Sequence, residues 1–194
     1  MVGAMNEPAK AGRKRDEAID VALLDVAQRH LAHFGYEAMS LAAVAEEAGT
    51  TRQALYRRFS SKADLATAAV AAMSSADERS ESDDPLSDLV RELQSFAVGV
   101  SRPNGMSLIG TMIQSSADPE LVESFRQRLV EPRRDRIRSI LRRGVQAKVL
   151  RADADVETAV SFCTGSWYAY AVAGARPPRD WPKRCAQLVW RSLQ

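Results

Sequence analysis

The sequence predicts an all-α protein, because its hydrophobic residues recur at three- and four-residue spacing and no alternating run of β-branched residues indicates a strand. The 194 residues are 45% hydrophobic and 27% charged, with 10 Gly and 8 Pro. This composition excludes the collagenous, disordered and disulfide-scaffold classes. We therefore expect one or two compact helical domains.

One composition break divides the chain. Residues 77–84 are acidic and serine-rich, and Pro85 follows them, which is typical of a linker. Four segments are expected: a flexible basic N-terminal arm (1–15), a first helical domain (16–76), an acidic linker (77–84) and a second helical domain (85–194).

The first domain opens with an amphipathic helix that is expected to end at Gly35, a residue that adopts the left-handed conformation at helix C-termini. The apolar face of this helix carries Ile19, Leu23, Val26, His30, Leu31 and Phe34.

Three short helices are expected to follow, each opened by a capping residue. Ser40 can cap a helix over 41–48, which Gly49 ends. Thr50 with Gln53 has the spacing of a capping box, and the helix that it opens is expected to reach Arg58 or Phe59. Ser61 with Asp64 opens a fourth helix.

Helices as short as those on either side of Gly49 are unstable alone and must pack against the first helix. The small side chain of Ala45 allows two helices to approach closely, and Leu55 with Phe59 returns apolar contacts to the core. The outer face then carries Thr51, Arg52, Gln53, Tyr56 and Arg57. Arg suits guanine and Gln suits adenine in a major groove, so this pattern predicts a helix-turn-helix.

The run from Ser40 to Leu65, SLAAVAEEAGTTRQALYRRFSSKADL, resembles the DNA-binding domain of the tetracycline-repressor (TetR) family, and the resemblance covers roughly residues 16–73. It includes the Leu-Tyr-x-x-Phe run and the Ser-Lys-x-Asp-Leu that follows. The family often has Gly, Ala or Pro at the position of Gln53, so the chain departs from the pattern there.

The resemblance implies phosphate contacts from Ser40, Tyr56 and Lys62, and base contacts from Arg52 and Gln53. The chemistry agrees, because a phenol hydroxyl and an ammonium group both suit phosphate oxygens. The expected DNA-binding residues are Ser40, Thr51, Arg52, Gln53, Tyr56, Arg57 and Lys62.

The second domain resembles the family's effector-binding and dimerisation half by its helix layout. Helices are expected at 86–100, 105–117, 119–148, 155–173 and 180–193. Asp118 before Pro119 and Asp180 before Trp181 are typical helix starts, whereas Pro132 should bend or split the third of these helices. That helix is rich in Arg, which indicates a solvated face more than a second nucleic-acid surface.

The helix at 155–173 is apolar or small on every side, so it must be covered on two sides. The same helix of a twofold partner is the expected second cover, in a four-helix interface of a homodimer. The interface residues are expected to be Ala159, Cys163, Ser166, Tyr170, Ala173, Leu188 and Val189. A dimer in turn implies a pseudo-palindromic double-stranded DNA operator.

Methionines and aromatic residues of the second domain are candidates to line an effector cavity. They are Phe96, Met106, Ile109, Met112, Ile113, Phe125, Phe162 and Trp167. Few ionisable groups are expected inside these helices, so the small-molecule effector should be neutral and largely apolar.

No pattern in the sequence indicates an enzyme, a cofactor or a metal site: His30 and His33 lack a third ligand, and the two cysteines are expected to be reduced thiols. The uncharged run at 158–175 is too rich in Ala, Gly, Ser and Thr for a membrane span, and no signal peptide is expected, so the protein should act in the cytoplasm, at the nucleoid. A ligand-responsive repressor ranks first. A helical protein-binding adaptor or dimerisation module without regulated DNA binding is the alternative, and an all-α enzyme ranks third.

Overall fold

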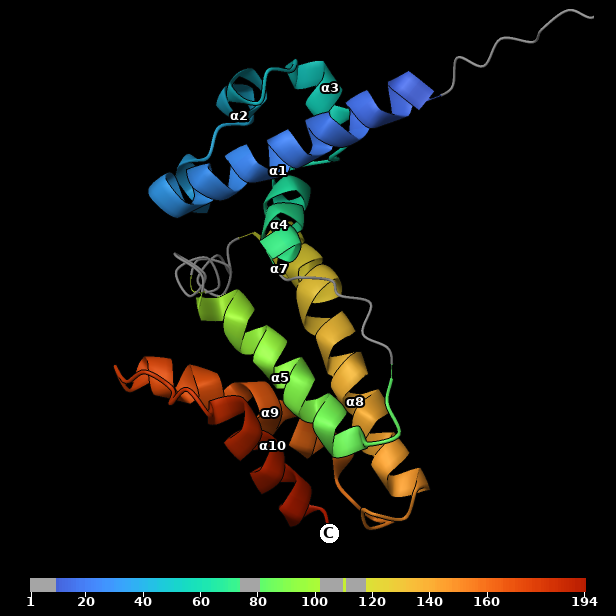
Figure 1. Cartoon of the computed structure of the whole chain (residues 1–194). Helices are drawn as coiled ribbons and strands as arrows, with labels where there is room; N and C mark the ends of the chain where they lie inside the picture. Colours follow the sequence, from blue (N-terminus) through green and yellow to red (C-terminus); the bar gives the residue numbers. More distant parts are fainter. Residues whose placement is uncertain (1–9, 74–80, 102–109, 111–117) are drawn as a thin grey trace, which may run out of the picture. The chain divides into compact units, whose positions relative to one another are not determined.

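The computed structural model describes residues 10–73, 81–101, 110 and 118–194, and every regular element in these ranges is a helix (Figure 1). The predicted all-α class is therefore confirmed. Two compact units form, one from Met1–Ala72 with Ser107–Ser124 and the other from Met73–Met106 with Phe125–Gln194. Each of the two units is thus made of two separate segments of the chain.

Among the described residues, the first unit contains four helices near the start of the chain and Pro119–Ser124 of another helix. They are α1 (Lys10–Ala38), α2 (Leu41–Glu47), α3 (Arg52–Tyr56), α4 (Lys62–Met73) and α7 (Pro119–Phe125). Because α1 begins at Lys10, the helix includes the last six residues of the expected N-terminal arm.

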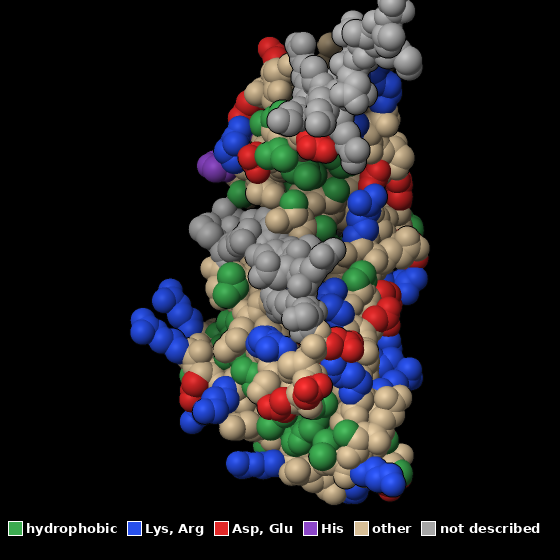
Figure 2. Space-filling view, turned by 45° about the vertical axis from the view of Figure 1, so that its right-hand side comes forward, with side chains coloured by type: hydrophobic (Ala, Val, Ile, Leu, Met, Phe, Trp, Pro, Cys, Tyr) green, Lys and Arg blue, Asp and Glu red, His purple; other side chains and the backbone are tan. Residues whose placement is uncertain are grey.

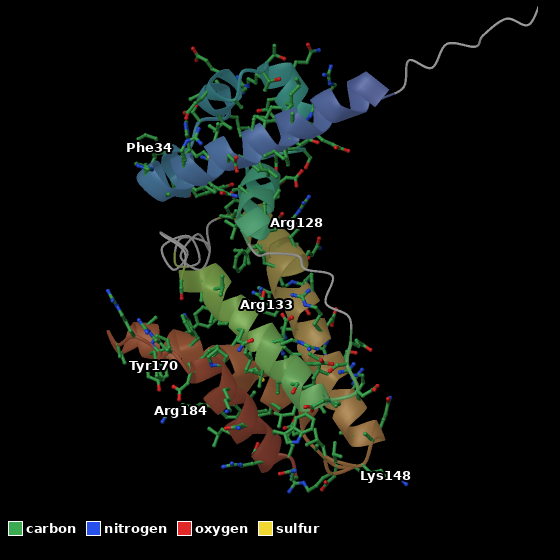
Figure 3. The ribbon with its side chains drawn as sticks, viewed as in Figure 1. Phe34, Arg128, Arg133, Lys148, Tyr170 and Arg184 are labelled. Carbon is green, nitrogen blue, oxygen red and sulfur yellow. The ribbon has the colours of Figure 1, made fainter. Side chains whose placement is uncertain are left out.

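Gly35 interrupts α1, as the sequence predicts, with a φ of 75° that places it in the left-handed region. Leu23, Val26 and Leu31 are buried, but Phe34 is 62% exposed and lies near the C-terminal end of the helix (Figure 3). The prediction that Phe34 belongs to the apolar face is wrong. The change of chain direction at Gly35 instead brings Tyr36 into the core, where it is 4% exposed.

The turn between α2 and α3 closes through the backbone. Thr50 N–H donates to the Ala45 carbonyl at 2.9 Å and Gly49 N–H donates to the Glu46 carbonyl at 3.0 Å, which is the Schellman pattern. This pattern needs a left-handed residue after the helix, and Gly49 supplies it with a φ of +68°. Ala45 is buried against the turn, as predicted.

The N-cap of α3 is Thr51, and the prediction of Thr50 is wrong. Thr51 Oγ1 makes the cap by accepting from Ala54 N–H at 3.1 Å, and the Thr50 N–H, bonded to the Ala45 carbonyl, is not donated to the Gln53 side chain as a capping box requires. The helix ends at Tyr56 and is shorter than expected, yet Leu55 and Phe59 are buried as predicted.

The start of α4 follows the sequence prediction. Ser61 Oγ accepts from Asp64 N–H at 3.0 Å, while the Asp64 carboxylate accepts from Ser60 N–H at 2.8 Å. These reciprocal bonds satisfy N–H groups that have no partner inside the helix. The buried side of the helix packs small and apolar residues into the core, including Leu65, Ala66 and Ala69.

In the part of the second unit that the structure describes, four α-helices and a π-helical turn are present. They are α5 (Pro85–Ser101), the π-helix η1 (Arg126–Val130), α8 (Glu131–Gln146), α9 (Val156–Val172) and α10 (Trp181–Ser192). The helix expected at 119–148 is split next to Pro132, as predicted, because proline has no N–H to donate into the helix. The helix expected at 105–117 lies outside the described residues, apart from Gly110.

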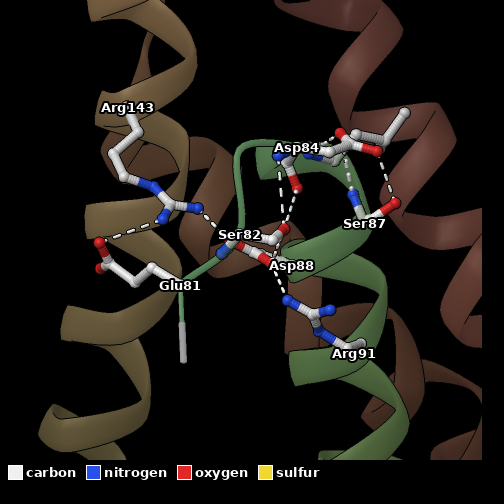
Figure 4. Close-up of polar contacts among 8 residues, drawn as sticks. Glu81, Ser82, Asp84, Ser87, Asp88, Arg91 and Arg143 are labelled. Carbon is white, nitrogen blue, oxygen red and sulfur yellow. Dashed lines mark hydrogen bonds and ion pairs between the residues drawn. The ribbon is translucent and has the colours of Figure 1, made fainter. Parts of the chain in front are cut away.

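Ion pairs cross the inside of the second unit, contrary to the expectation that few ionisable groups lie there. Asp88 of α5, 6% exposed, accepts from Ser82, Arg91 and Arg143 (Figure 4). Burial by itself would raise the pKa of Asp88, but the hydrogen bonds from Ser82 and Arg143 outweigh burial and hold that pKa below its ordinary value. Glu92, 5% exposed, pairs with Arg133 and Arg136 of α8.

We expect Gly49→Ala to lower the free energy of unfolding by about 1–2 kcal/mol, the cost of placing a Cβ in the left-handed conformation. Urea denaturation measures this change. Gly165→Ala is the matched control, because Gly165 lies on an exposed helix face where an added Cβ would meet no atom within 4 Å, and alanine there gains up to about 1 kcal/mol of helix propensity. Equal stability of the two variants would contradict the role given to Gly49.

Gly144→Ala tests the packing of the second unit, since a Cβ at this position would lie 2.7 Å from Trp190 and 2.8 Å from Leu150. Overpacking costs about 1–3 kcal/mol, which exceeds the gain of roughly 1 kcal/mol in helix propensity. We therefore expect a net loss of stability in urea, again measured against Gly165→Ala. A variant as stable as the wild type would show that Trp190 and Leu150 move aside freely.

Candidate nucleic-acid interface

The exposed side of α3 carries the predicted base-reading residues. Arg52, Gln53, Tyr56 and Arg57 are all exposed, while Leu55 on the opposite side is fully buried. Burial of Leu55 fixes which side of the helix faces outward. The helix therefore presents two cations, an amide and a phenol to solvent on one short surface.

Arg52 and Tyr56 contact each other on this surface. Arg52 Nη2 donates to the Tyr56 hydroxyl at 3.2 Å, and the guanidinium carbon lies 5.4 Å from the centre of the Tyr56 ring. The pairing restricts two long side chains before any ligand arrives. Their N–H and O–H groups are thus presented together, a guanidinium beside a phenol hydroxyl.

Gln53, Thr51 and Ser40 differ in what they can offer. The side chain of Gln53 is exposed and is not used by the N-cap of α3, which Thr51 makes with Ala54. Thr51 Oγ1 is occupied as a hydrogen-bond acceptor in that cap. Ser40 Oγ accepts from Ala43 N–H at 3.4 Å at the start of α2, and its hydroxyl hydrogen is still available to a phosphate oxygen.

Lys62, the expected phosphate contact at the start of α4, is half-buried rather than free in solvent. Its Nζ donates to the Glu37 carbonyl at 2.8 Å and lies 4.7 Å from the centre of the Tyr36 ring. An ammonium group has three N–H donors, so two remain for a phosphate.

Arg58, which the sequence places in the same basic run, has a structural role. Its Nε pairs with Asp20 of α1, and its Nη1 donates to the Ala54 carbonyl at 3.0 Å. The residue thereby joins α3 to α1. Sequence spacing gives no signal for this role, because the pair is separated by 38 positions.

The histidines are not brought together as metal ligands. His30 Nε2 lies 2.9 Å from Glu47 Oε2, and Arg29 donates to the other oxygen at 2.7 Å. The hydrogen bond from Arg29, followed by that from His30, lowers the pKa of Glu47. Within the described ranges, no three His, Cys, Asp or Glu side chains are placed to hold a metal ion.

The residues expected at a dimer interface do not share one face. Ala159, Cys163 and Val189 are buried inside the second unit, and Ser166 is half-buried. The assignment of the three buried residues to an open interface is wrong, since they pack inside the same protomer, whereas the assignment of Ser166 stays a prediction. Tyr170, Ala173 and Leu188, in contrast, are exposed as a dimer contact requires.

An exposed apolar stripe runs along the other side of α9, and we call it the α9 stripe: Thr158, Phe162, Gly165, Ala169 and Val172. Phe162 is 62% exposed and Val172 90% exposed. A hollow of about 350 Å³ beside it is lined by residues that include Phe162, Tyr170 and Leu188 of α10. Figure 3 labels Tyr170 and Arg184 in this region.

Only part of the expected effector pocket comes together. Phe96 and Trp167 pack edge to face at 6.0 Å, beside Trp181, and Arg133 from α8 lies over the Phe96 ring at 5.1 Å (Figure 3). Phe162 lies on the exposed α9 stripe instead, and Phe125 is half-buried. The remaining candidates, Met106, Ile109, Met112 and Ile113, lie outside the described residues.

The arginines of α8 are largely neutralised by neighbouring acids. Arg138 pairs with Glu157 at 2.6 Å, Arg136 pairs with Glu92 at 3.1 Å, and Arg143 pairs with Asp88. Lys and Arg side chains lie among Asp and Glu side chains on the face drawn in Figure 2. This arrangement favours the interpretation of α8 as a solvated, ion-paired helix.

Among the helices that the structure describes, none combines the length and the apolar character that crossing a bilayer requires.

Two family descriptions match the chain over most of its length. Residues 23–69 match bacterial regulatory proteins of the tetR family, and residues 80–189 match the tetracyclin repressor-like C-terminal domain. A curated relative, the uncharacterized HTH-type transcriptional regulator YdeS of Bacillus subtilis (strain 168), is 27% identical over 160 residues, which cover 81% of this chain and 80% of YdeS.

Solved structures share the fold. A TetR transcriptional regulator from Agrobacterium tumefaciens has a TM-score of 0.69 at 18% identity, covering 92% of this chain and 98% of that one. The regulator FadR from Bacillus subtilis, solved in complex with stearoyl-CoA, has a TM-score of 0.64 at 16% identity, covering 89% of this chain and 96% of that one. The chain belongs to the tetR family of bacterial regulatory proteins, which are DNA-binding transcription regulators and not enzymes.

Proposed function

We propose that the protein is a dimeric repressor that binds a pseudo-palindromic operator and is released from it by a small, largely apolar effector. The observation that carries the DNA-binding part is the exposed pair Arg52–Tyr56 on a helix whose other side is fixed by buried Leu55. Its site of action would then be chromosomal DNA. The domain roles that we propose are DNA binding for 16–76 and effector binding with dimerisation for 85–194.

Within the operator complex, we assign phosphate contacts to Ser40, Tyr56 and Lys62 and base contacts to Arg52 and Gln53, with Thr51 and Arg57 at the edge of the same surface. Phosphate contacts fix the register of the protein on the duplex, and base contacts select the sequence. The exposure of Arg52 and Gln53 on α3 supports this division.

The aromatic cluster around Phe96 and Trp167 supports an effector with an apolar body. Buried Arg133 beside it also supplies a polar contact that the sequence does not suggest. Selection of genomic DNA fragments bound by the protein would identify the operator and the regulated genes, and thereby the chemical class of effector to test by thermal stabilisation.

We expect Tyr56→Phe to weaken binding to cognate and random DNA about equally, because it removes a phosphate contact, and Arg52→Ala to cost roughly 1–3 kcal/mol on cognate DNA alone. Fluorescence anisotropy over a range of salt concentrations measures both. Arg151→Ala is the control, since it removes an exposed arginine from the second unit and should leave both affinities unchanged. An equal loss for Arg52→Ala on random DNA would make Arg52 a backbone contact.

The same salt titration distinguishes the proposed repressor from the alternative function, a helical adaptor without regulated DNA binding. Counterion release makes DNA affinity fall steeply with salt, whereas an adaptor would show no DNA binding at moderate salt.

The second half of the proposal is that the protein forms a homodimer, and this can be tested. We expect Gly165→Arg to dissociate it, since the new charge lies on the α9 stripe and meets no atom of its own protomer within 4 Å of the Cβ. Sedimentation velocity at micromolar concentration measures the mass, and circular dichroism checks that the fold is kept. Val98→Arg, at an exposed apolar position of α5, is the control. A monomeric wild type, or a dimeric Gly165→Arg variant, would remove the α9 stripe from the interface.

A further inference from the structure

A chain of three side chains links the start of α7 to the start of α4 inside the first unit. The Tyr36 hydroxyl donates to Asp118 Oδ2 at 2.8 Å, and the Tyr36 ring lies under the Lys62 ammonium at 4.7 Å. Asp118 also caps α7 by accepting from Leu121 N–H at 3.0 Å. One carboxylate therefore holds both the first turn of α7 and the ring beneath Lys62.

Both ends of the α7 segment in this unit are attached. At its far end Ser124 Oγ lies 2.7 Å from Thr67 Oγ1, and Thr67 is a fully buried residue of α4. The position of α7 is thus defined by one hydrogen bond to α1 and one to α4. Beyond Ser124 the chain continues directly into the π-helical turn and α8.

We propose that Tyr36 and Asp118 are positioning residues for DNA binding, which hold the Lys62 ammonium ready for a phosphate and make its position depend on α7. The proposal rests on the proposed function, because it takes Lys62 as a phosphate contact. Neither Tyr36 nor Asp118 touches DNA in this account.

The geometry explains how the link works. Lys62 has a long, flexible side chain, and ordering such a side chain on binding lowers the affinity. The Glu37 carbonyl and the Tyr36 ring hold the ammonium in place beforehand, leaving two N–H donors for the phosphate. The ring itself is held by Asp118, so a displacement of α7 releases the ring and then the lysine.

The ionisation states of Asp118 and Tyr36 suit the hydrogen bond between them. The N–H of Leu121 and the Tyr36 hydroxyl keep the pKa of Asp118 below its ordinary value, so it is an ionised acceptor at neutral pH. Burial, with the bond to Asp118, raises the pKa of Tyr36, which therefore stays a neutral donor. The hydrogen bond is accordingly formed throughout the physiological range.

The experiment measures binding of the full-length protein to a short DNA duplex of arbitrary sequence over a range of salt concentrations. We expect Tyr36→Phe, which keeps the ring and loses only the hydroxyl, to weaken binding by roughly two- to tenfold, the equivalent of one reordered side chain. Asp118→Ser keeps an N-cap but is too short to reach Tyr36, and should weaken binding to the same extent. Asp118→Asn keeps one oxygen for the Leu121 cap and places an NH2 group at Tyr36, where it can donate to the hydroxyl oxygen, so this variant should bind DNA more tightly than Asp118→Ser.

The decisive comparison is made in a Lys62→Met background, which itself should lower the salt dependence by about one phosphate contact. There, Tyr36→Phe should have no further effect on affinity. If Tyr36→Phe weakens binding equally with and without Lys62, the hydroxyl acts on the general fold and the proposal is overturned.

Two further outcomes separate the link from the proposed function. If Lys62→Met changes affinity but Tyr36→Phe does not, the link between Tyr36 and Lys62 is wrong while the DNA-binding function stands. If the wild type does not bind the duplex at all, the proposed function itself is wrong.

Discussion

The helix that faces DNA in our proposal, α3, has only five residues, and helices of fewer than about 12–15 residues are marginal in water on their own. Its shape and direction must therefore come from contacts outside it. Buried Leu55 anchors one side, Arg58 joins it to Asp20 of α1, and the Schellman turn at Gly49 sets its angle to α2. These contacts fix which side of α3 is buried. They thereby determine which of its side chains are exposed to a ligand.

The features of the first unit that the sequence predicts are those set by nearby residues. The turn at Gly49, the cap by Ser61 and Asp64, and the burial of Leu55 follow from local spacing and chemistry. The prediction fails at Thr50 because its N–H is bonded to the Ala45 carbonyl and is not donated to the Gln53 side chain, while the Thr51 hydroxyl makes the cap. It fails at Phe34 because the chain turns one residue later at Gly35, and Tyr36, beyond that turn, is the aromatic residue that enters the core.

Less of the second unit could be predicted, for a physical reason. A helix such as α9 with apolar or small residues on every side does not indicate which side faces inward. Cys163 rather than Phe162 faces inward because Cys185 of α10 packs at its carbonyl and Trp167, one turn further along α9, packs against Phe96 and Trp181. The burial of Asp88 depends likewise on Arg143, which is 55 positions away. A charged residue is assigned to the surface by default, and only tertiary structure supplies the partner that makes its burial tolerable.

The DNA-facing side chains are held by internal bonds that binding does not require them to break. The Lys62 ammonium can keep its bond to the Glu37 carbonyl while a phosphate takes its other donors, so binding there adds an interaction without removing one. Arg52 uses one N–H of its guanidinium on the Tyr56 hydroxyl, and the remaining N–H donors are enough for a bidentate contact with a guanine while the pair stays intact. On a random sequence the pair stays together without a base partner, and on the cognate sequence the base contact is added to it. Sequence selection by Arg52 and general affinity through phosphate contacts would thus be separate additions to one preformed surface.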